Sequence, residues 1–178
     1  MNQPPLCVDL DGTLVAIDTL KKCLHILVRE KPWLSPLLPL YLIRGRAEFK
    51  DRLAQLVELE AKRLPYRREV VEFLQEEQAQ GRRLILATAA NHRIAEAVAR
   101  HLGLFDVVIA SDRVHNQKGV FKLRAIREVV QKDIFDYMGD SIVDLPIFQA
   151  ARVAILVRPS KRLLKRVRTS CRVWRVFE

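Results

Sequence analysis

Two aspartates, Asp9 and Asp11, interrupt an apolar run at residues 5–16, whose sequence is PLCVDLDGTLVA. The run is otherwise typical of a buried strand, and a buried carboxylate without a partner costs free energy. Because side chains alternate between the two faces of a strand, both acids point towards the same side. Gly12 follows directly and lets the backbone turn tightly there. The spacing indicates two carboxylates that act together.

Other polar residues fall at the ends of later predicted strands. Thr88 ends the second strand, Asp140 ends the fourth, and Asp144 follows one helical turn later, where it can cap a helix. Ligands bind beyond the carboxyl ends of parallel strands, so these side chains should converge with the two aspartates on one crevice. An ammonium group comes from Lys118 or Lys122, which lie before and at the start of a helix, with Lys122 slightly favoured.

This set of groups suits phosphate chemistry with magnesium. Clustered carboxylates repel one another unless a cation lies among them, and Mg²⁺ prefers oxygen ligands. One carboxylate can attack phosphorus to form an aspartyl-phosphate, while a second protonates the leaving oxygen and then activates water. The lysine, the Thr88 hydroxyl and backbone N–H groups would hold the phosphoryl oxygens. We therefore expect a small phosphorylated substrate and Mg²⁺ as cofactor.

Short β-rich runs alternate with helical patterns, which predicts an α/β fold with a parallel sheet flanked by helices. The predicted strands are residues 6–10, 84–88, 107–111, 135–140 and 153–157. The first two strands are separated by far more residues than a crossover needs, and a structureless loop of that length is improbable. We predict a core of residues 1–17 and 65–158, with a helical cap inserted at residues 18–64.

Within this insertion, residues 32–43 (PWLSPLLPLYLI) form a strongly apolar stretch. A transmembrane helix needs about 20 apolar residues, so this stretch is too short to span a bilayer. A packed helical lid is the first interpretation, and docking on a membrane surface is the second.

The positive charge is concentrated at the end of the chain. The net charge is +10, and residues 158–178 hold eight Lys or Arg against one Glu. We interpret residues 159–178 as a basic tail, either a weakly ordered extension or a segment that binds an acidic partner. A nucleic acid and a membrane surface are the two acidic partners considered.

Three cysteines without metal-ligand spacing and a start without an apolar signal segment predict a cytoplasmic protein, with the inner face of the membrane as a further option.

The segments DLDGT, LILAT, NQKGVFK and GDSIVD, in this order, resemble the motifs of the haloacid dehalogenase superfamily. The resemblance implies a Rossmann-like core and phosphohydrolase activity. It implies that Asp9 is the nucleophile and a metal ligand, and that Asp11 is the general acid/base and binds metal through its backbone carbonyl. The remaining implied roles are phosphate binding by Thr88, Ala89 and Lys122 or Lys118, metal binding by Asp140, and support by Gly12 and Asp144.

A narrower resemblance rests on the segments LLPLYLIRGRAEFK, LPYRREV, LATAANHRIAEAVARHLGLFDVVIASD, NQKG, FDYMGDSIVDL and AILVRPS. They are similar to the domain found N-terminal to UbiA-type prenyl transferases, in which a membrane bundle follows. The resemblance implies that the basic tail contacts a membrane surface or a prenyltransferase domain, which makes a nucleic acid the less favoured partner. We therefore predict a Mg²⁺-dependent phosphatase that acts through an aspartyl-phosphate and is tied to prenyl-lipid metabolism. The alternatives are a non-catalytic domain that binds a phospholipid or a substrate, and a phosphatase of nucleic-acid ends.

Overall fold

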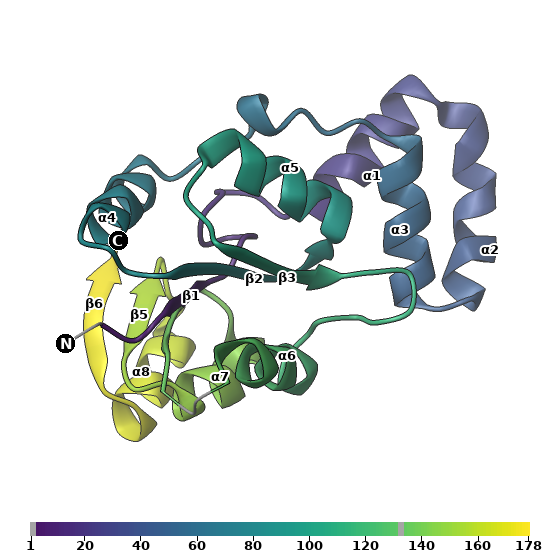
Figure 1. The fold of residues 1–178 in the computed structure, drawn as a ribbon. Coiled ribbons are helices and arrows are strands. Elements are labelled where there is room, and N and C mark those ends of the chain that lie inside the picture. The colour runs from purple at the N-terminus through teal and green to yellow at the C-terminus, as the bar shows by residue number, and fades with distance from the viewer. Residues whose placement is uncertain (1–2, 132–133) are drawn as a thin grey trace.

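The computed structural model describes residues 3–131 and 134–178 and contains one six-stranded sheet. The strands are β1 (Leu6–Val8), β2 (Leu84–Asn91), β3 (Val107–Ser111), β4 (Asp136–Gly139), β5 (Ala154–Val157) and β6 (Val173–Phe177). They pair in the order β3-β2-β1-β4-β5-β6, and every pairing is parallel (Figure 1). The predicted parallel α/β sheet is confirmed. β1 lies at its centre, so the aspartates that follow it emerge in the middle of the carboxyl edge.

Helices cover both faces of the sheet. One face is covered by α4 (Arg68–Ala79) and α5 (His92–Leu102), and the other by α6 (Val120–Val130), α7 (Leu145–Ala150) and α8 (Lys161–Ser170). Alternation along each strand divides the core accordingly: Leu6 and Val8 pack on the α4 and α5 side, whereas Cys7 packs on the opposite side. Strands buried on both faces explain why the sequence shows unbroken apolar runs.

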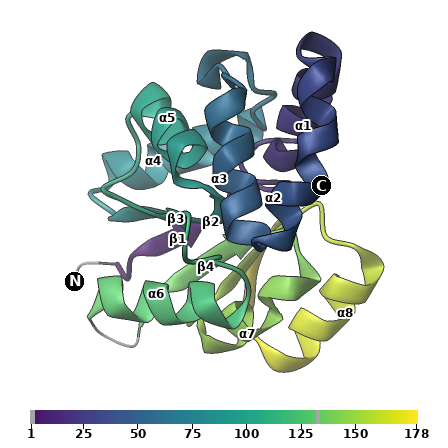
Figure 2. The same ribbon diagram turned by 90° about the vertical axis from the view of Figure 1, so that its right-hand side faces the viewer.

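The residues between β1 and α4 form helices that lie beyond the carboxyl ends of the central strands (Figures 1 and 2). They are α1 (Thr19–Glu30), α2 (Leu38–Ile43) and α3 (Arg46–Leu56), with short 3₁₀ helices η1 (Pro32–Leu37) and η2 (Ala61–Arg63). Asp18 caps α1 by accepting a hydrogen bond from the backbone N–H of Lys21 at 3.0 Å. Leu27 of α1 and Leu53 of α3 are buried in the same core as α4. This packing holds the inserted helices over the edge of the sheet.

The apolar stretch at residues 32–43 is helical but only partly packed. Leu34 and Leu38 lie against the core, whereas Trp33 is 69% exposed and Ile43 is 83% exposed. The stretch therefore covers the core with one side and leaves large apolar side chains in contact with solvent on the other.

The expectation of a weakly ordered extension at residues 159–178 is wrong. Ser160 caps α8 at the backbone N–H of Leu163, Leu163 and Val167 are fully buried, and β6 adds a parallel strand beside β5. Residues 159–178 contain seven Lys or Arg, but Leu163, Leu164 and Val167 recur among them at helical spacing. Deleting this segment would expose the core, so the tail's charges have to be tested by substitution.

Among the helices in the described ranges, none has the length and apolar character needed to cross a bilayer.

Candidate active site

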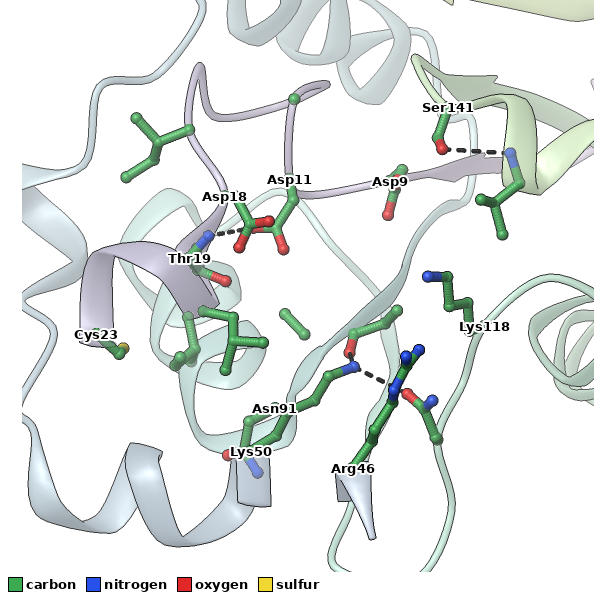
Figure 3. A pocket seen from close by; sticks show the side chains of 18 of the residues that line it. Asp9, Asp11, Asp18, Thr19, Cys23, Arg46, Lys50, Asn91, Lys118 and Ser141 are labelled. Carbon is green, nitrogen blue, oxygen red and sulfur yellow. Dashed lines mark hydrogen bonds between the residues drawn. The ribbon is translucent and has the colours of Figure 1, made fainter. Parts of the chain in front are cut away.

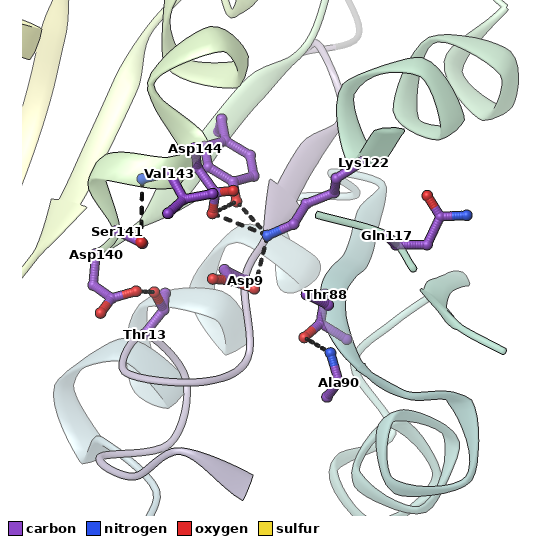
Figure 4. A network of polar contacts seen from close by, with 12 residues as sticks. Asp9, Thr13, Thr88, Ala90, Gln117, Lys122, Asp140, Ser141, Val143 and Asp144 are labelled. Atoms are coloured by element: carbon purple, nitrogen blue, oxygen red, sulfur yellow. Dashed lines mark hydrogen bonds and ion pairs between the residues drawn. The ribbon is translucent and has the colours of Figure 1, made fainter. Parts of the chain in front are cut away.

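Asp9 directly follows β1, and its carboxylate contacts a lysine of α6. The Nζ atom of Lys122 donates to Oδ1 of Asp9 at 3.0 Å and to Oδ2 of Asp144 at 2.9 Å (Figure 4). The hydroxyl of Tyr137 lies 3.0 Å from the same Nζ and donates to Asp144 at 2.7 Å. All four side chains are buried, so one ammonium group offsets much of the cost of two buried carboxylates.

Burial has the largest single effect on the pKa values of both Asp9 and Lys122. Desolvation raises the pKa of Asp9 to about 7, although the nearby Lys122 ammonium opposes the rise. Burial alone would lower the pKa of Lys122, but the carboxylates of Asp9 and Asp144 outweigh it and raise that pKa, so the lysine stays charged. Asp9 is therefore a carboxylate for which a further cation would be favourable.

Asp11 lines the same cavity as Asp9 and contacts the first of the inserted helices, α1. Its Oδ1 accepts a hydrogen bond from the backbone N–H of Thr19, the first residue of α1, at 3.0 Å (Figure 3). Desolvation raises the pKa of Asp11 to about 6, against the opposing effect of this hydrogen bond. A carboxyl group with a raised pKa can carry a proton near neutral pH, which is what a general acid requires.

Gly12 allows the third carboxylate to approach the backbone. Its φ is +77°, and a Cβ atom built on it would lie 2.1 Å from Oδ2 of Asp140. Asp140 follows β4, and its Oδ1 accepts a hydrogen bond from Thr13 at 3.1 Å. A side chain at position 12 would thus be strained and would displace Asp140, so the glycine is needed for both its conformation and its size.

The carboxylate and carbonyl oxygens at this edge are of the type that Mg²⁺ prefers as ligands. Burial raises the pKa of Asp9, Asp11 and Asp140, and the Asp140 carboxylate contributes to the rise at Asp9. In the described part of the chain, no three acidic, His or Cys side chains are close enough together to hold a metal ion by themselves. The predicted ligand set, two carboxylates and the Asp11 carbonyl, is compatible with that finding, because Mg²⁺ normally keeps several waters.

The second motif differs in detail from the prediction. β2 continues to Asn91, so Thr88 does not end the strand, and its pairing with β3 shifts register between Ala87 and Asn91. Thr88 is buried and its Oγ1 accepts the backbone N–H of Ala90 at 3.0 Å. Ala89 lines the cavity. Asn91, not Thr88, caps α5.

The two candidate lysines occupy different places. Lys122 lies in the buried network with Asp9, whereas Lys118 is exposed at the wall of the cavity. Asp144 is the N-cap residue of α7, as predicted, but its side chain makes no cap hydrogen bond. Its carboxylate instead accepts hydrogen bonds from Lys122 and Tyr137, which agrees with the predicted support of the lysine.

The sequence did not single out several other groups at the site. Tyr137 sits in the middle of a buried strand, where its hydroxyl needs a partner, and that requirement was a usable signal. Arg46 and Lys50 of α3 also line the cavity, which has a volume of about 560 Å³. They are spaced four residues apart, but the sequence does not show that this face of α3 turns towards the sheet.

Comparison with known proteins agrees with this geometry. The chain is 37% identical over 154 residues to "Uncharacterized protein y4nM" of Sinorhizobium fredii, a match that covers 86% of this chain and 30% of that protein. The chain therefore spans less than a third of that relative's length.

Several solved structures share the fold. A protein of unknown function from Bordetella pertussis Tohama I has a TM-score of 0.76 at 18% identity, with 100% of this chain and 99% of that chain covered. A phosphoserine phosphatase in its apo form has a TM-score of 0.67 at 15% identity, with 99% and 94% covered. The haloacid dehalogenase-like hydrolase family matches residues 6–149, which is most of the chain. The chain belongs to the haloacid dehalogenase-like hydrolases.

Proposed function

We propose that this protein is a Mg²⁺-dependent phosphatase that hydrolyses a phosphate monoester through an aspartyl-phosphate on Asp9. The observation that carries the proposal is the placement of Asp9 and Asp11 on one cavity, with Lys122 in contact with the first and not the second. The two carboxyl groups thus have different surroundings, which suits a nucleophile and an acid/base. Solved phosphoserine phosphatases with the same fold support the proposal.

In the first half-reaction, a carboxylate oxygen of Asp9 attacks phosphorus, and the bond from phosphorus to the ester oxygen breaks. Asp11 gives its proton to that oxygen, so the product leaves as a neutral alcohol. Lys122 lies close enough to Asp9 to offset negative charge on the phosphoryl oxygens, and the Thr88 hydroxyl keeps its own proton free to donate. Phosphorus is then bonded to Asp9.

In the second half-reaction, Asp11 accepts a proton from water, whose oxygen attacks phosphorus. The bond to Asp9 breaks, which releases inorganic phosphate and restores the free carboxylate. A magnesium ion held by Asp9, Asp140 and the Asp11 carbonyl would neutralise charge on the phosphoryl group. Gly12 leaves the space that Asp140 occupies beside this group.

A screen of phosphate monoesters tests the proposal directly. With Mg²⁺ present, we expect the purified protein to release inorganic phosphate from at least one ester, and removal of the metal with EDTA should abolish the release. Restored Mg²⁺ should restore turnover. If a broad set of esters gives no Mg²⁺-dependent phosphate, the chain is better described as a non-catalytic domain that binds a phospholipid or other phosphorylated substrate.

The raised pKa values also predict how the metal-free protein responds to pH. Asp9 binds its proton more tightly when folded, with a pKa of about 7 against an ordinary value of 3.8. Its protonation stabilises the fold at low pH, and this contribution is lost as pH rises through about 7. In EDTA, the unfolding free energy of the wild type should fall relative to Asp9→Asn between acid and neutral pH, by on the order of 2 kcal/mol.

Denaturant unfolding at several pH values measures this difference, and added Mg²⁺ should reduce it at neutral pH. A difference that is independent of pH would contradict the assigned protonation of Asp9.

Two finer proposals concern the setting of the reaction. We propose that the substrate belongs to prenyl-lipid metabolism and that basic residues of α8 contact a membrane surface or a prenyltransferase domain, which the resemblance of the sequence motifs supports. Action on nucleic-acid ends is the second candidate, favoured by the same basic residues. Charge reversal at exposed positions of α8 distinguishes these candidates. If α8 contacts a membrane, the variant should no longer sediment with anionic vesicles. If the protein acts on nucleic-acid ends, the variant should lose turnover on a 3′-phosphorylated oligonucleotide.

A further inference from the structure

Three cationic side chains line the cavity outside the Asp9 network. Arg46 and Lys50 come from α3, and Lys118 comes from the loop before α6. In Figure 3, Arg46 and Lys50 lie on the opposite side of the cavity from Asp9 and Asp11. The mechanism proposed above assigns no role to Arg46 or Lys50.

These cations have no acidic partner in the described ranges. The Nζ atom of Lys50 donates to the carbonyl oxygen of Ala89 at 2.7 Å and to Oδ1 of Asn116 at 2.8 Å, and both acceptors are uncharged. Across residues 3–131 and 134–178, no carboxylate lies within ion-pair distance of Arg46, Lys50 or Lys118. Lys122, by contrast, contacts the carboxylates of both Asp9 and Asp144.

Holding the cluster together costs free energy. Arg46 and Lys50 are four residues apart on one helix, a spacing at which like charges destabilise the helix. Lys50 is also half-buried, and its desolvation lowers its pKa. The carboxylates of Asp11 and Asp18 partly oppose this lowering, but neither forms an ion pair with Lys50. A ligand anion between the cationic side chains would therefore reduce the remaining repulsion.

The cavity has room for such an anion. Its volume of about 560 Å³ is much larger than a phosphoryl group requires, so the remaining space is available to the leaving group of an ester. Leu42 and Phe49 line the cavity together with the cations. A leaving group would therefore meet both apolar and cationic side chains.

We propose that Arg46, Lys50 and Lys118 bind a second anionic group, a carboxylate or a second phosphate, carried by the leaving group of the substrate. This inference rests on the proposed phosphatase function and narrows its substrate class to phosphate monoesters that carry a second acidic group remote from the phosphorus that is attacked. Neutral or cationic leaving groups would leave the cluster without a partner.

A set of matched esters tests the proposal. We compare phenyl phosphate with its ortho-, meta- and para-carboxy derivatives, and with the corresponding phosphono derivatives, which separates a carboxylate from a phosphate-like group. At least one anionic derivative should have a kcat/KM about tenfold above that of phenyl phosphate, the gain of one hydrogen bond between charged groups. In Arg46→Met and Lys50→Met the ratio should fall towards one.

Arg44→Met is the matched control for Arg46→Met, because Arg44 is also exposed and lies two residues away but does not line the cavity. It should keep the wild-type ratio. High salt should reduce the preference in the wild type.

Binding to the Asp9→Asn variant keeps the inference separate from the proposed activity. Calorimetric titration with the same esters gives dissociation constants without turnover, and the anionic derivative should again bind about tenfold more tightly. If no ester is hydrolysed but this preference is present, the phosphatase proposal fails and the second anion site stands. If phenyl phosphate and all of its anionic derivatives bind and react equally, or if Arg44→Met has the same effect as Arg46→Met, the inference is overturned.

Discussion

Replacement of Asp9 by asparagine should lower kcat for every ester that the protein hydrolyses by at least about a thousandfold. The amide has nearly the same shape, and its oxygen can still accept the hydrogen bond that Lys122 donates at 3.0 Å. It lacks the negative charge and the nucleophilicity needed to form a bond to phosphorus. The expected loss is therefore chemical, and the fold should remain, because Asp144 still pairs with Lys122. Initial-rate kinetics and circular dichroism measure the two effects.

Asp112→Asn is the control for this substitution. Asp112 is outside the cavity and its carboxylate accepts the backbone N–H groups of Val114 and His115, which an asparagine side chain can also do. Its turnover should stay within about twofold of the wild type, since surface substitutions away from special features have small effects. Turnover by Asp9→Asn close to the wild-type rate would show that another residue attacks phosphorus.

Replacement of Lys122 by methionine should damage both activity and stability. The ammonium group is 2% exposed and is the shared partner of Asp9 and Asp144, so its removal leaves two buried carboxylates side by side. Breaking a buried ion pair in this way costs about 3–5 kcal/mol, and the loss of one donor to the phosphoryl group costs about a hundredfold or more in kcat. Denaturant unfolding and steady-state kinetics measure the two losses.

Lys118→Met separates the two lysines that the sequence left open. Lys118 is exposed and has no carboxylate partner in the described ranges. The unfolding free energy of the Lys118→Met protein should therefore differ from that of the wild type by less than about 0.5 kcal/mol. A large loss of stability in Lys118→Met with little change in Lys122→Met would contradict the network in the structure.

At low pH the Lys122→Met variant should recover part of its stability, because protonation removes the repulsion between the carboxyl groups.

Much of the site could be predicted because each side chain stands at the end of a recognisable strand. The apolar runs that precede Asp9, Asp11 and Asp140 are predicted strands, and such strands alternate with helical patterns along the chain, which indicates a parallel sheet. In a parallel sheet the carboxyl ends of the strands lie at one edge, so these side chains come together there. These inferences need only local patterns and the rule that joins them.

The remaining features depend on three-dimensional contacts that no local pattern encodes. The carboxylate of Asp144 prefers Lys122 to the helix end only because the fold brings a residue 22 positions away within 2.9 Å. Arg46 and Lys50 reach the site because Leu53 anchors α3 in the core. In the basic tail, the charge composition indicates an exposed extension, whereas the spacing of Leu163 and Val167 indicates a buried helix face, and the helix is followed by the strand beside β5. The charge content of a segment indicates how polar its exposed surface is, whereas the spacing of its apolar residues indicates which face it buries.

The covalent intermediate is the most direct test of the account. The protein is mixed with a hydrolysed ester and Mg²⁺, quenched during turnover and treated with borohydride, which reduces an acyl phosphate on aspartate to homoserine; the product is then located by peptide mass spectrometry. We predict homoserine at position 9, dependent on both ester and metal, and none in Asp9→Asn. Release of phosphate with homoserine at another aspartate, or with no reduced residue under conditions that trap acyl phosphates, would contradict the role of Asp9 as the nucleophile.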